Sequence, residues 1–533
     1  MLPERRKTST ERGNLVKRIA HVLLLALLAV GLSRHGHAQV SVLTYHNDNF
    51  RTGANTNETI LTPAIVRSNI FKRVFTCGVD GSVYAQPLVA AGVNTLRAGP
   101  RNVVYVATEH DSVYAFDADT GHRYWHTKLL PRHGRTVLTN DVACADLIPE
   151  IGVTSTPVID PTTSTLYVLE KGKTNTVFFQ RLHALDLATG AEKFGGPVTL
   201  AASTPGTGDG SVNGAVAYDS LRQHQRSALL LVSNIVYIAS ASHCDNDPYH
   251  GWILGYNATN LQQTTVFNAT PNGGRGGLWM SGGGLAVDDQ GNIYCSTGNG
   301  TLDADTGGSD YGDSVLKLDG NNGLAVEDFF TPFNESDLNA NDVDLGSGGI
   351  VLLPDQPGAH PHLAITAGKE GRIYLLDRDN LGQFQSGSDS QIVQSLPNAT
   401  GRAFYTPAYF NGFIFCQGDS DVLKCFSITN GLLSINPVSQ SATTFDFPGA
   451  QASVSANGTN NAIVWTIQTD AYLVRKGQAV LHAYDANDLT QELFNSTTRR
   501  QLPGNAVKFA VPTIANGRGY VGAVRRLAVY GLR

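Results

Sequence analysis

Residues 103–121 read VVYVATEHDSVYAFDADTG, and this stretch contains the unit from which most of the chain is built. A run of β-branched and aromatic residues is followed by a polar turn, a second such run and an Asp-Thr-Gly ending. Alternation of apolar and polar residues with a period of two is typical of β-strands, and Gly, Asp and Asn favour the turns between them. The stretch therefore predicts a β-hairpin that ends in a tight turn.

Seven further copies of this pattern follow along the chain, with no convincing helical periodicity between them. The spacing between equivalent positions lies between 50 and 71 residues, which leaves room for about four strands in each copy. Repeated units of this kind form the blades of a β-propeller. The sequence predicts an all-β, eight-bladed β-propeller of four-stranded blades. The equivalent positions are Tyr105, Tyr167, Tyr237, Tyr294, Ile365, Phe415, Trp465 and Tyr520.

The eighth copy ends at Arg533, soon after its third strand, and would leave an open sheet edge. We expect the run Phe71–Val79 to supply the missing outer strand and to close the ring. Residues 71–533 would then form a single propeller domain after an N-terminal extension at 39–70. Seven blades and a separate terminal hairpin are the alternative.

The first 38 residues differ in kind from the rest of the chain. Six basic residues precede an apolar run of 14 residues, Ile19–Leu32, and small residues follow at Gly36 and Ala38. This pattern predicts a signal peptide at 1–38 and a periplasmic or secreted protein, with an uncleaved anchor as the alternative. No later stretch approaches the 20 apolar residues of a membrane span, so the mature chain is expected to have no transmembrane segment.

Removal of this leader would leave 32 basic and 43 acidic residues, a net charge of −11. A negatively charged protein does not present the basic surface that nucleic-acid binding requires, so no nucleic-acid partner is expected. None of the 6 cysteines falls in a CxxC or CxxCH spacing, and neither a zinc ribbon nor an attached haem is indicated.

Two groups of motifs carry a resemblance to a known family. The copy endings FDADTGHRYW (116–125) and LDLATGAEKF (185–194) resemble repeats of the pyrroloquinoline quinone (PQQ) type, and LWMSGGGLAVDDQGNIYCSTGNG (278–300) is more specific. Together they resemble the quinoprotein alcohol dehydrogenase superfamily, from residue 45 almost to the C-terminus. The resemblance implies that Trp279 lies under the flat quinone and that Asn299 is a calcium ligand.

The same resemblance implies two catalytic positions. Residues 331–337, TPFNESD, resemble a segment whose last residue, Asp337, would be the catalytic base, although Asp342 and Asp344 follow close behind it. Within AGKEGRIYLLDRDN (367–380), Lys369 matches the cation that contacts the quinone oxygens. A positive charge there would stabilise negative charge on the quinone as it is reduced.

The remaining calcium position departs from the family pattern. A ligand Glu of the family falls on Asn246, which is flanked by Asp245 and Asp247. These residues, with Asn299 and Asp337, are the candidate metal ligands, because oxygen atoms suit a hard cation.

The resemblance implies a PQQ- and calcium-dependent dehydrogenase that oxidises a small alcohol or sugar and needs an external electron acceptor. A non-catalytic propeller, serving as an envelope scaffold or as a carbohydrate- or protein-binding module, is the alternative.

Two cysteine pairs are candidates for contact. A hairpin turning symmetrically about Ser420 and Asp421 would place Cys416 directly opposite Cys425, close enough for contact and for a strained disulfide. Cys144 and Cys244, in polar loops, are the second candidate pair.

Overall fold

The computed structural model describes residues 39–96, 98–474 and 476–533 of the chain. Val40–Arg533 form one compact unit. The predicted signal peptide at 1–38 lies outside the described residues. Within the described residues, no helix is long and apolar enough to cross a membrane.

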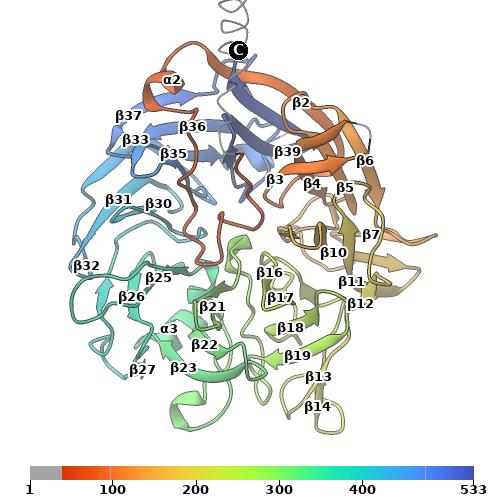
Figure 1. The fold of residues 1–533 in the computed structure, drawn as a ribbon. Coiled ribbons are helices and arrows are strands. Elements are labelled where there is room, and N and C mark those ends of the chain that lie inside the picture. The colour runs from red at the N-terminus through yellow and green to blue at the C-terminus, as the bar shows by residue number, and fades with distance from the viewer. Residues whose placement is uncertain (1–38, 97, 475) are drawn as a thin grey trace, which may run out of the picture. The chain divides into compact units, whose positions relative to one another are not determined.

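Val40–Arg533 fold as an eight-bladed β-propeller, as the sequence predicts (Figure 1). Blades 1 to 4 follow one another around the ring. Blade 1 contains β3 (Leu88–Thr95), β4 (Gly99–Thr108), β5 (Ser112–Asp117) and β6 (Arg123–Lys128), and blade 2 contains β9 (Val158–Asp160), β10 (Thr165–Thr174), β11 (Val177–Asp186) and β12 (Val198–Thr199). Blade 3 contains β16 (Leu230–Val232), β17 (Ile235–Ser242), β18 (Trp252–Asn257) and β19 (Gln263–Asn268). Blade 4 contains β20 (Ala286–Val287), β21 (Asn292–Ser296), β22 (Val315–Asp319) and β23 (Ala325–Thr331).

Blades 5 to 8 complete the ring. Blade 5 contains β24 (Val351–Leu352), β25 (Leu363–Ala367), β26 (Ile373–Asp377) and β28 (Gln394–Leu396), and blade 6 contains β29 (Ala408–Phe410), β30 (Phe413–Cys416), β31 (Asp421–Thr429) and β33 (Ser439–Phe445). Blade 7 contains β34 (Ser453–Asn457), β35 (Asn460–Gln468), β36 (Val480–Asp485) and β37 (Asp488–Asn495). Blade 8 contains β38 (Thr513–Ala515), β39 (Arg518–Leu532) and β2 (Phe71–Ser82).

Shorter elements connect or extend the blades. These are β1 (Ala54–Asn55), α2 (Pro63–Arg67), β7 (Arg135–Leu138), β8 (Glu150–Ile151), β13 (Ser203–Pro205), β14 (Ala215–Ala217), β15 (Gln223–His224), η1 (Met280–Gly282), η2 (Ala304–Thr306), α3 (Glu335–Ala340), η3 (Leu345–Ser347), β27 (Gln383–Phe384), β32 (Leu432–Leu433) and η4 (Asp470–Leu473).

The positions predicted to be equivalent occupy the same place in every blade. Each lies in the second strand from the propeller axis and pairs with a residue of the innermost strand, as Tyr105 does with Leu88 and Trp465 with Ser453. All are at most 3% exposed. The repeat read from the sequence is therefore confirmed at the level of single residues.

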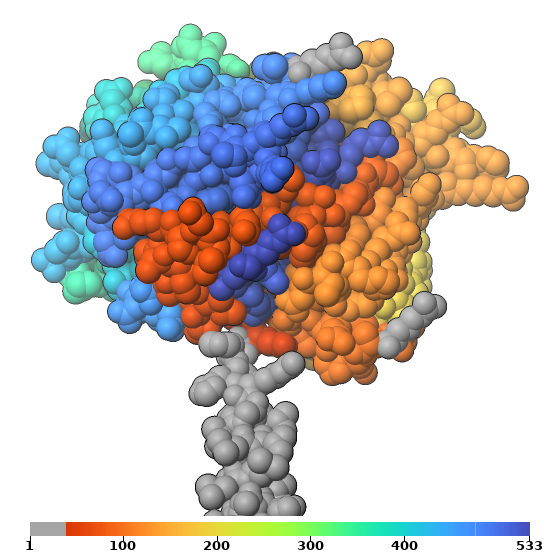
Figure 2. Space-filling view, turned by 90° about the horizontal axis from the view of Figure 1, so that it is seen from above, coloured from red at the N-terminus to blue at the C-terminus, as the bar shows by residue number. Residues whose placement is uncertain are grey.

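The last blade joins the two ends of the described chain. β2 pairs antiparallel with the second half of β39, from Phe71 opposite Leu532 onward, and β38 pairs with the first half. Arg525, with φ of 57°, turns the chain between the two halves. Figure 2 shows the dark blue C-terminal residues lying between red and orange N-terminal segments. The predicted closure of the ring by an N-terminal strand is confirmed.

The core lies between the blades. One apolar layer, for example, is formed by Val104 and Tyr114 of blade 1 against Leu527 and Val529 of blade 8. Comparable layers join the other neighbouring blades around the ring. Because burial of one large apolar side chain stabilises a fold by about 1.5–3 kcal/mol, these layers hold the blades together.

Residues 40–58, which we call the axial belt, run around the axis and bond to the innermost strand of every blade. Backbone bonds join it to Val89, Ile159, Val287, Leu352, Tyr409 and Val454, and side-chain amides reach Leu231 and Ile514. Arg51 of the belt is fully buried and donates to Leu285 O, Thr44 Oγ1 and Tyr45 O. The belt thus ties the blades together at their inner edge, in the middle of the ring in Figure 1.

The cysteine expectations have opposite outcomes. Cys144 and Cys244 form a disulfide, whereas Cys416 and Cys425 are free and buried. The predicted hairpin register is wrong by one residue, since Cys425 lies opposite Phe415 and Cys416 opposite Lys424. A shift of one residue moves a side chain to the other sheet face, and the two thiols pack in different inter-blade layers.

Candidate functional site

A cavity of about 200 Å³ lies where the chain enters the innermost strands of several blades. Its walls come from the segments before β16, β20, β24 and β38. They also come from the connections between the second and third strands of blades 3, 4 and 5, namely β17–β18, β21–β22 and β25–β26. The lining residues are Asp146, His224, Arg226, Ala241, Ser242, Cys244, Asp245, Tyr249, Gly277, Trp279, Gly298, Asn299, Asp342, Asp344, Lys369 and Phe509. Residues more than 300 positions apart in sequence therefore meet at one site.

One end of the cavity is an ion-pair network, which we call the carboxylate end. Lys369 Nζ lies 2.6 Å from Asp342 Oδ1 and 2.5 Å from Asp344 Oδ1. Trp279 Nε1 donates to Asp344 Oδ2 at 2.8 Å, and Asn299 Nδ2 donates to Asp342 Oδ1 at 3.0 Å. Three of the residues matched to the family, namely Trp279, Asn299 and Lys369, thus converge.

Local backbone geometry fixes this arrangement. Met280 and Ser281, directly after Trp279, have φ of 42° and 48°, so the chain turns sharply behind the indole. A Cβ on Gly298 would lie 3.0 Å from Asp344 Oδ2, so a glycine at this position leaves room for that carboxylate. The Lys369 ammonium also lies 5.7 Å from the centre of the Trp279 ring, within the range of a cation–π contact.

Burial and charge compete at the carboxylate end. Burial raises the pKa of Asp344, and the ammonium of Lys369 offsets only part of this effect. For Lys369 burial acts to lower the pKa, but the carboxylates of Asp344 and Asp342 outweigh it and the pKa is raised. Lys369 is therefore a cation at neutral pH, and the two carboxylates beside it leave a net negative charge when both are ionised.

A second group of residues at the cavity is basic, and we call it the basic end. Arg226 is 4% exposed, lies 4.4 Å from the centre of the Phe509 ring, and burial lowers its pKa. Its neighbour Lys508 is ion-paired with Asp146. His224 is also buried, and burial together with the Arg226 charge lowers its pKa to about 3. His224 is therefore neutral at physiological pH.

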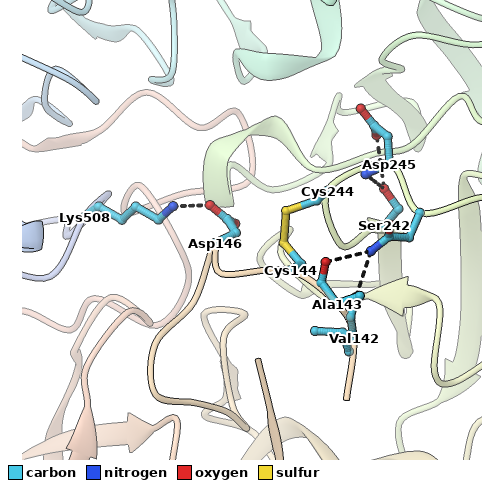
Figure 3. The surroundings of a disulfide bond; sticks show 9 residues. Val142, Ala143, Cys144, Asp146, Ser242, Cys244, Asp245 and Lys508 are labelled. Carbon is cyan, nitrogen blue, oxygen red and sulfur yellow. Dashed lines mark hydrogen bonds and ion pairs between the residues drawn. A yellow bond between two sulfur atoms is a disulfide. The ribbon is translucent and has the colours of Figure 1, made fainter. Parts of the chain in front are cut away.

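A disulfide joins two loops at the basic end of the cavity (Figure 3). Cys244 lines the cavity, and Cys144 belongs to the loop that brings Asp146 to Lys508. Beside the bridge, Asn246 Nδ2 donates to Val142 O at 2.7 Å. The bridge thus fixes one wall of the cavity.

Asp245, Asn246 and Asp247, which lie where the sequence departs from the family's calcium ligand, make different contacts. Asp245 lines the cavity and accepts from Tyr249 Oη at 2.7 Å. Asn246 bonds to the neighbouring loop, and Asp247 forms an ion pair with Arg275 at 2.6 Å. Neither of these two is among the lining residues, so Asp245 is the residue that brings an acidic oxygen to the cavity from this loop.

The structure does not bring Asp337 to the cavity. This residue is exposed on α3, a helix that sequence reasoning did not expect. The chain leaves α3, passes Asp342 with φ of 54°, and only then delivers Asp342 and Asp344 to the cavity wall. The acidic residues of this segment that line the cavity are therefore Asp342 and Asp344, not Asp337.

Within the described part of the chain, several residues that line the cavity have buried side-chain atoms without a hydrogen-bond partner. These atoms are Asn299 Oδ1, His224 Nε2, and Arg226 Nε and Nη1, together with Asp344 Oδ1, which is ion-paired with Lys369. Buried polar atoms in native proteins nearly always have partners, so such a set indicates a polar ligand. Sequence reasoning missed His224 and Arg226, and no motif marks either of them.

Comparisons with known proteins give relatives by structure only. No protein-family model and no curated protein sequence matches this chain. A quinohemoprotein alcohol dehydrogenase from Pseudomonas putida HK5 superposes with a TM-score of 0.59 at 14% identity, covering 92% of this chain and 80% of that one.

Two further structures agree with it. A quinohemoprotein alcohol dehydrogenase from Comamonas testosteroni gives a TM-score of 0.62 at 15% identity, covering 93% of this chain and 81% of its own. A europium-containing methanol dehydrogenase gives 0.60 at 12% identity, covering 92% and 98%. At these identities the likeness concerns the fold alone, and this protein has a β-propeller fold similar to that of the quinoprotein alcohol dehydrogenases.

Proposed function

We propose that this protein is an exported quinoprotein-type dehydrogenase that oxidises a small alcohol or sugar with PQQ and calcium. The observation that carries the proposal is the set of unpartnered buried atoms on Asn299, His224 and Arg226, three residues that line the same cavity as Trp279 and Lys369. The structural neighbours named above support the same reading.

The residues fit a planar, anionic quinone. Trp279 offers a flat apolar surface, and Arg226 supplies positive charge. The residues also fit a hard cation, because Asn299 Oδ1 is free and the carboxyl groups of Asp342, Asp344 and Asp245 line the same cavity. When bound, the quinone would accept two electrons and the calcium ion would act as a Lewis acid.

The chain's own residues would then have distinct tasks. Trp279 would hold the plane of the ring system, while its N–H keeps Asp344 in place. Lys369 would present its positive charge to developing negative charge, because Asp344 and Asp342 hold the ammonium in position.

Asp342 is the candidate base in place of Asp337. Its side chain is 68% exposed, and Lys369 and Asn299 bind only its Oδ1, so that the carboxylate remains open to a substrate hydroxyl. Asp344 is a weaker candidate because it is buried and bound on both oxygens, by Lys369 and by Trp279. Electrons must leave to an external acceptor, since the sequence holds no haem-attachment motif.

The test is turnover with PQQ, calcium and an artificial electron acceptor, over a panel of small alcohols and sugars. Asp342→Asn should lower kcat by about 10²–10⁴-fold, the usual contribution of a general base. Asp337→Asn is the matched control and should keep wild-type turnover. Loss of turnover in Asp337→Asn alone, or an inactive wild-type protein that binds PQQ and calcium, would contradict these roles.

A non-catalytic propeller, acting as an envelope scaffold or a carbohydrate- or protein-binding module, is the second candidate. One observation favours it: at the position where the resemblance expects a ligand Glu, Asn246 bonds to a backbone carbonyl of the next loop. A protein that binds no quinone but retains its fold and its export would fit this candidate.

A further inference from the structure

We propose that Arg226, assisted by His224, is a carboxylate-binding site at the basic end of the cavity. This inference deepens the proposed function, on which it rests, because it names the ligand group and the residues that would hold it. Neither residue belongs to the positions matched to the family.

Within the part of the chain that the structure describes, the charge of Arg226 has no ion-pair partner. Its Nε and Nη1 make no hydrogen bond although the residue is 4% exposed. Asp146, the acidic residue with the largest electrostatic effect on Arg226, is ion-paired with Lys508 instead. Phe509 and Tyr84 face the guanidinium with their rings, at 4.4 and 5.4 Å, and aromatic rings cannot accept its in-plane N–H bonds in the way a carboxylate does.

His224 provides a second group without a hydrogen-bond partner, two residues before Arg226. Its Nε2 is buried without a partner, and the residue lines the same cavity. His224 stacks on His243 at 4.3 Å between ring centres, and Lys171 Nζ lies 2.9 Å from His243 Nε2. A neutral His224 can donate an N–H to an anion bound at Arg226.

The position relative to Trp279 connects this site to the rest of the cavity. A Cβ on Gly282, in the turn that follows Trp279, would lie 3.7 Å from Arg226 Nε. Because Trp279, Arg226 and the carboxylate end line one cavity, a flat ligand resting on the indole would reach the guanidinium with one edge and the carboxylate end with another. An anionic group at the first edge and a polar or cation-bound group at the second would satisfy the unpartnered atoms at both ends.

A planar carboxylate can come from two sources, the carboxylates of the quinone or a carboxylate on the substrate. The first experiment titrates PQQ and its methyl ester, in which the carboxylates are esterified, into wild-type protein and Arg226→Gln, with binding measured by calorimetry. Loss of a charge-assisted bond should weaken PQQ binding to Arg226→Gln by about 10- to 100-fold. Arg402→Gln, which removes an exposed arginine outside the cavity lining, should bind PQQ like wild type.

The comparison of ligands separates this bond from the other roles of the carboxylates. Because esterification and Arg226→Gln remove the same contact, the loss on esterification should be at least about tenfold smaller in the variant than in wild type. Equal losses in both proteins, or unchanged PQQ binding to Arg226→Gln, would overturn the inference while the proposed function stands.

Unfolding of the empty protein provides a readout that a structural role would move. If Arg226 is a binding site for an anion, its buried charge has no partner in the empty protein and destabilises the fold. The Arg226→Gln variant without ligand should then unfold at the wild-type temperature or above it. A clearly lower unfolding temperature would assign Arg226 to packing against Phe509 and Tyr84 and would contradict the proposal.

Failure of PQQ to bind wild-type protein would refute the proposed cofactor but not the anion site. Isophthalate and isophthalamide, planar probes that differ in charge, would then be compared in metal-free buffer. Stabilisation of wild type but not Arg226→Gln by isophthalate alone supports the site and a carboxylate-bearing substrate. No effect of isophthalate on wild type in that case would overturn it.

Discussion

Replacement of Lys369 by methionine tests the ion-pair network of the carboxylate end without any ligand. The Lys369 and Asp344 side chains are 14% and 4% exposed, so the pair is shielded from water. Without the ammonium, Asp344 keeps the N–H of Trp279 as its donor among the bonds described above. Removal of one partner of a buried ion pair costs about 3–5 kcal/mol.

The pH sets a ceiling on this loss, because the carboxyl group can take up a proton instead of remaining charged. Protonation costs about 1.4 kcal/mol for each pH unit above the unfolded-state pKa of about 3.9. The loss from an unpaired Asp344 is therefore at most about 4 kcal/mol at pH 7 and about 1.5 kcal/mol at pH 5. Burial raises the folded-state pKa of Asp344, so this residue destabilises the folded state at high pH. The loss of folding free energy is absent below the unfolded-state pKa and grows as the pH rises toward the folded-state pKa.

The assay is thermal unfolding of the empty protein at pH 5 and pH 7. For a folded unit of about 500 residues, 1 kcal/mol shifts Tm by about 1 °C, so Lys369→Met should lose about 3–4 °C at pH 7 and at most about 1.5 °C at pH 5. Adding Asp344→Asn should restore Tm at pH 7, because the amide carries no charge. Lys317→Met, whose partner Glu327 has a 39% exposed side chain, is the matched control and should change Tm little at either pH.

An equal loss at both pH values, or a double variant no more stable than Lys369→Met, would refute the reasoning about Asp344. Such a result would assign the stabilising effect of Lys369 to its aliphatic packing.

Three further predictions concern the fold. Cys144→Ser with Cys244→Ser should lower the free energy of unfolding by about 3–5 kcal/mol, since the bridge closes a long loop, and dithiothreitol should lower the Tm of wild type but not of this variant. Phe71→Ala should cost about 3–5 kcal/mol by truncating a buried ring of the closing strand, as seen in urea unfolding; a wild-type midpoint would argue against a closed ring. Cys416 and Cys425 should resist a thiol reagent in native protein because burial raises the pKa of both thiols to about 12, and should react fully in denaturant; rapid native labelling would contradict their burial.

The blade count could be predicted because it depends on local patterns that recur along the chain. Each hairpin with its turn is short, and positions such as Tyr105 and Trp465 mark the same register in successive copies. Closure by Phe71–Val79 followed from the open edge that the last copy would otherwise expose. The blade count thus needed no contact between distant residues, and the one distant pairing, closure of the ring, followed from that count.

The hairpin of Cys416 shows where such reasoning fails. A symmetric two-residue turn and a turn centred on Ser420, which has φ of 56°, differ by one residue in register. That difference decides whether two thiols meet or point into different layers. Composition of the turn, with Gly418 and Asp419 ahead of Ser420, does not distinguish the two.

Some residues of the candidate site could be predicted from the sequence, and others could not. Trp279, Asn299 and Lys369 were found because each lies in a segment resembling a family motif. Arg226 and His224 carry no such mark, and their importance comes from burial and from partners missing in three dimensions. We propose Asp342 rather than Asp337 as the base because α3 holds Asp337 away from the cavity, and the strand pattern did not predict this helix of six residues.

The measurement that tests the central claim most directly is a titration of the purified mature protein with PQQ, with and without calcium, followed by fluorescence and absorption. The site described above predicts saturable binding of one PQQ per chain at micromolar concentration or below, tighter with calcium and weakened in Trp279→Ala by about 1–3 kcal/mol, a range taken from bases stacked on aromatic side chains. No saturable binding at micromolar PQQ with excess calcium would contradict the quinoprotein assignment and leave the non-catalytic propeller as the function.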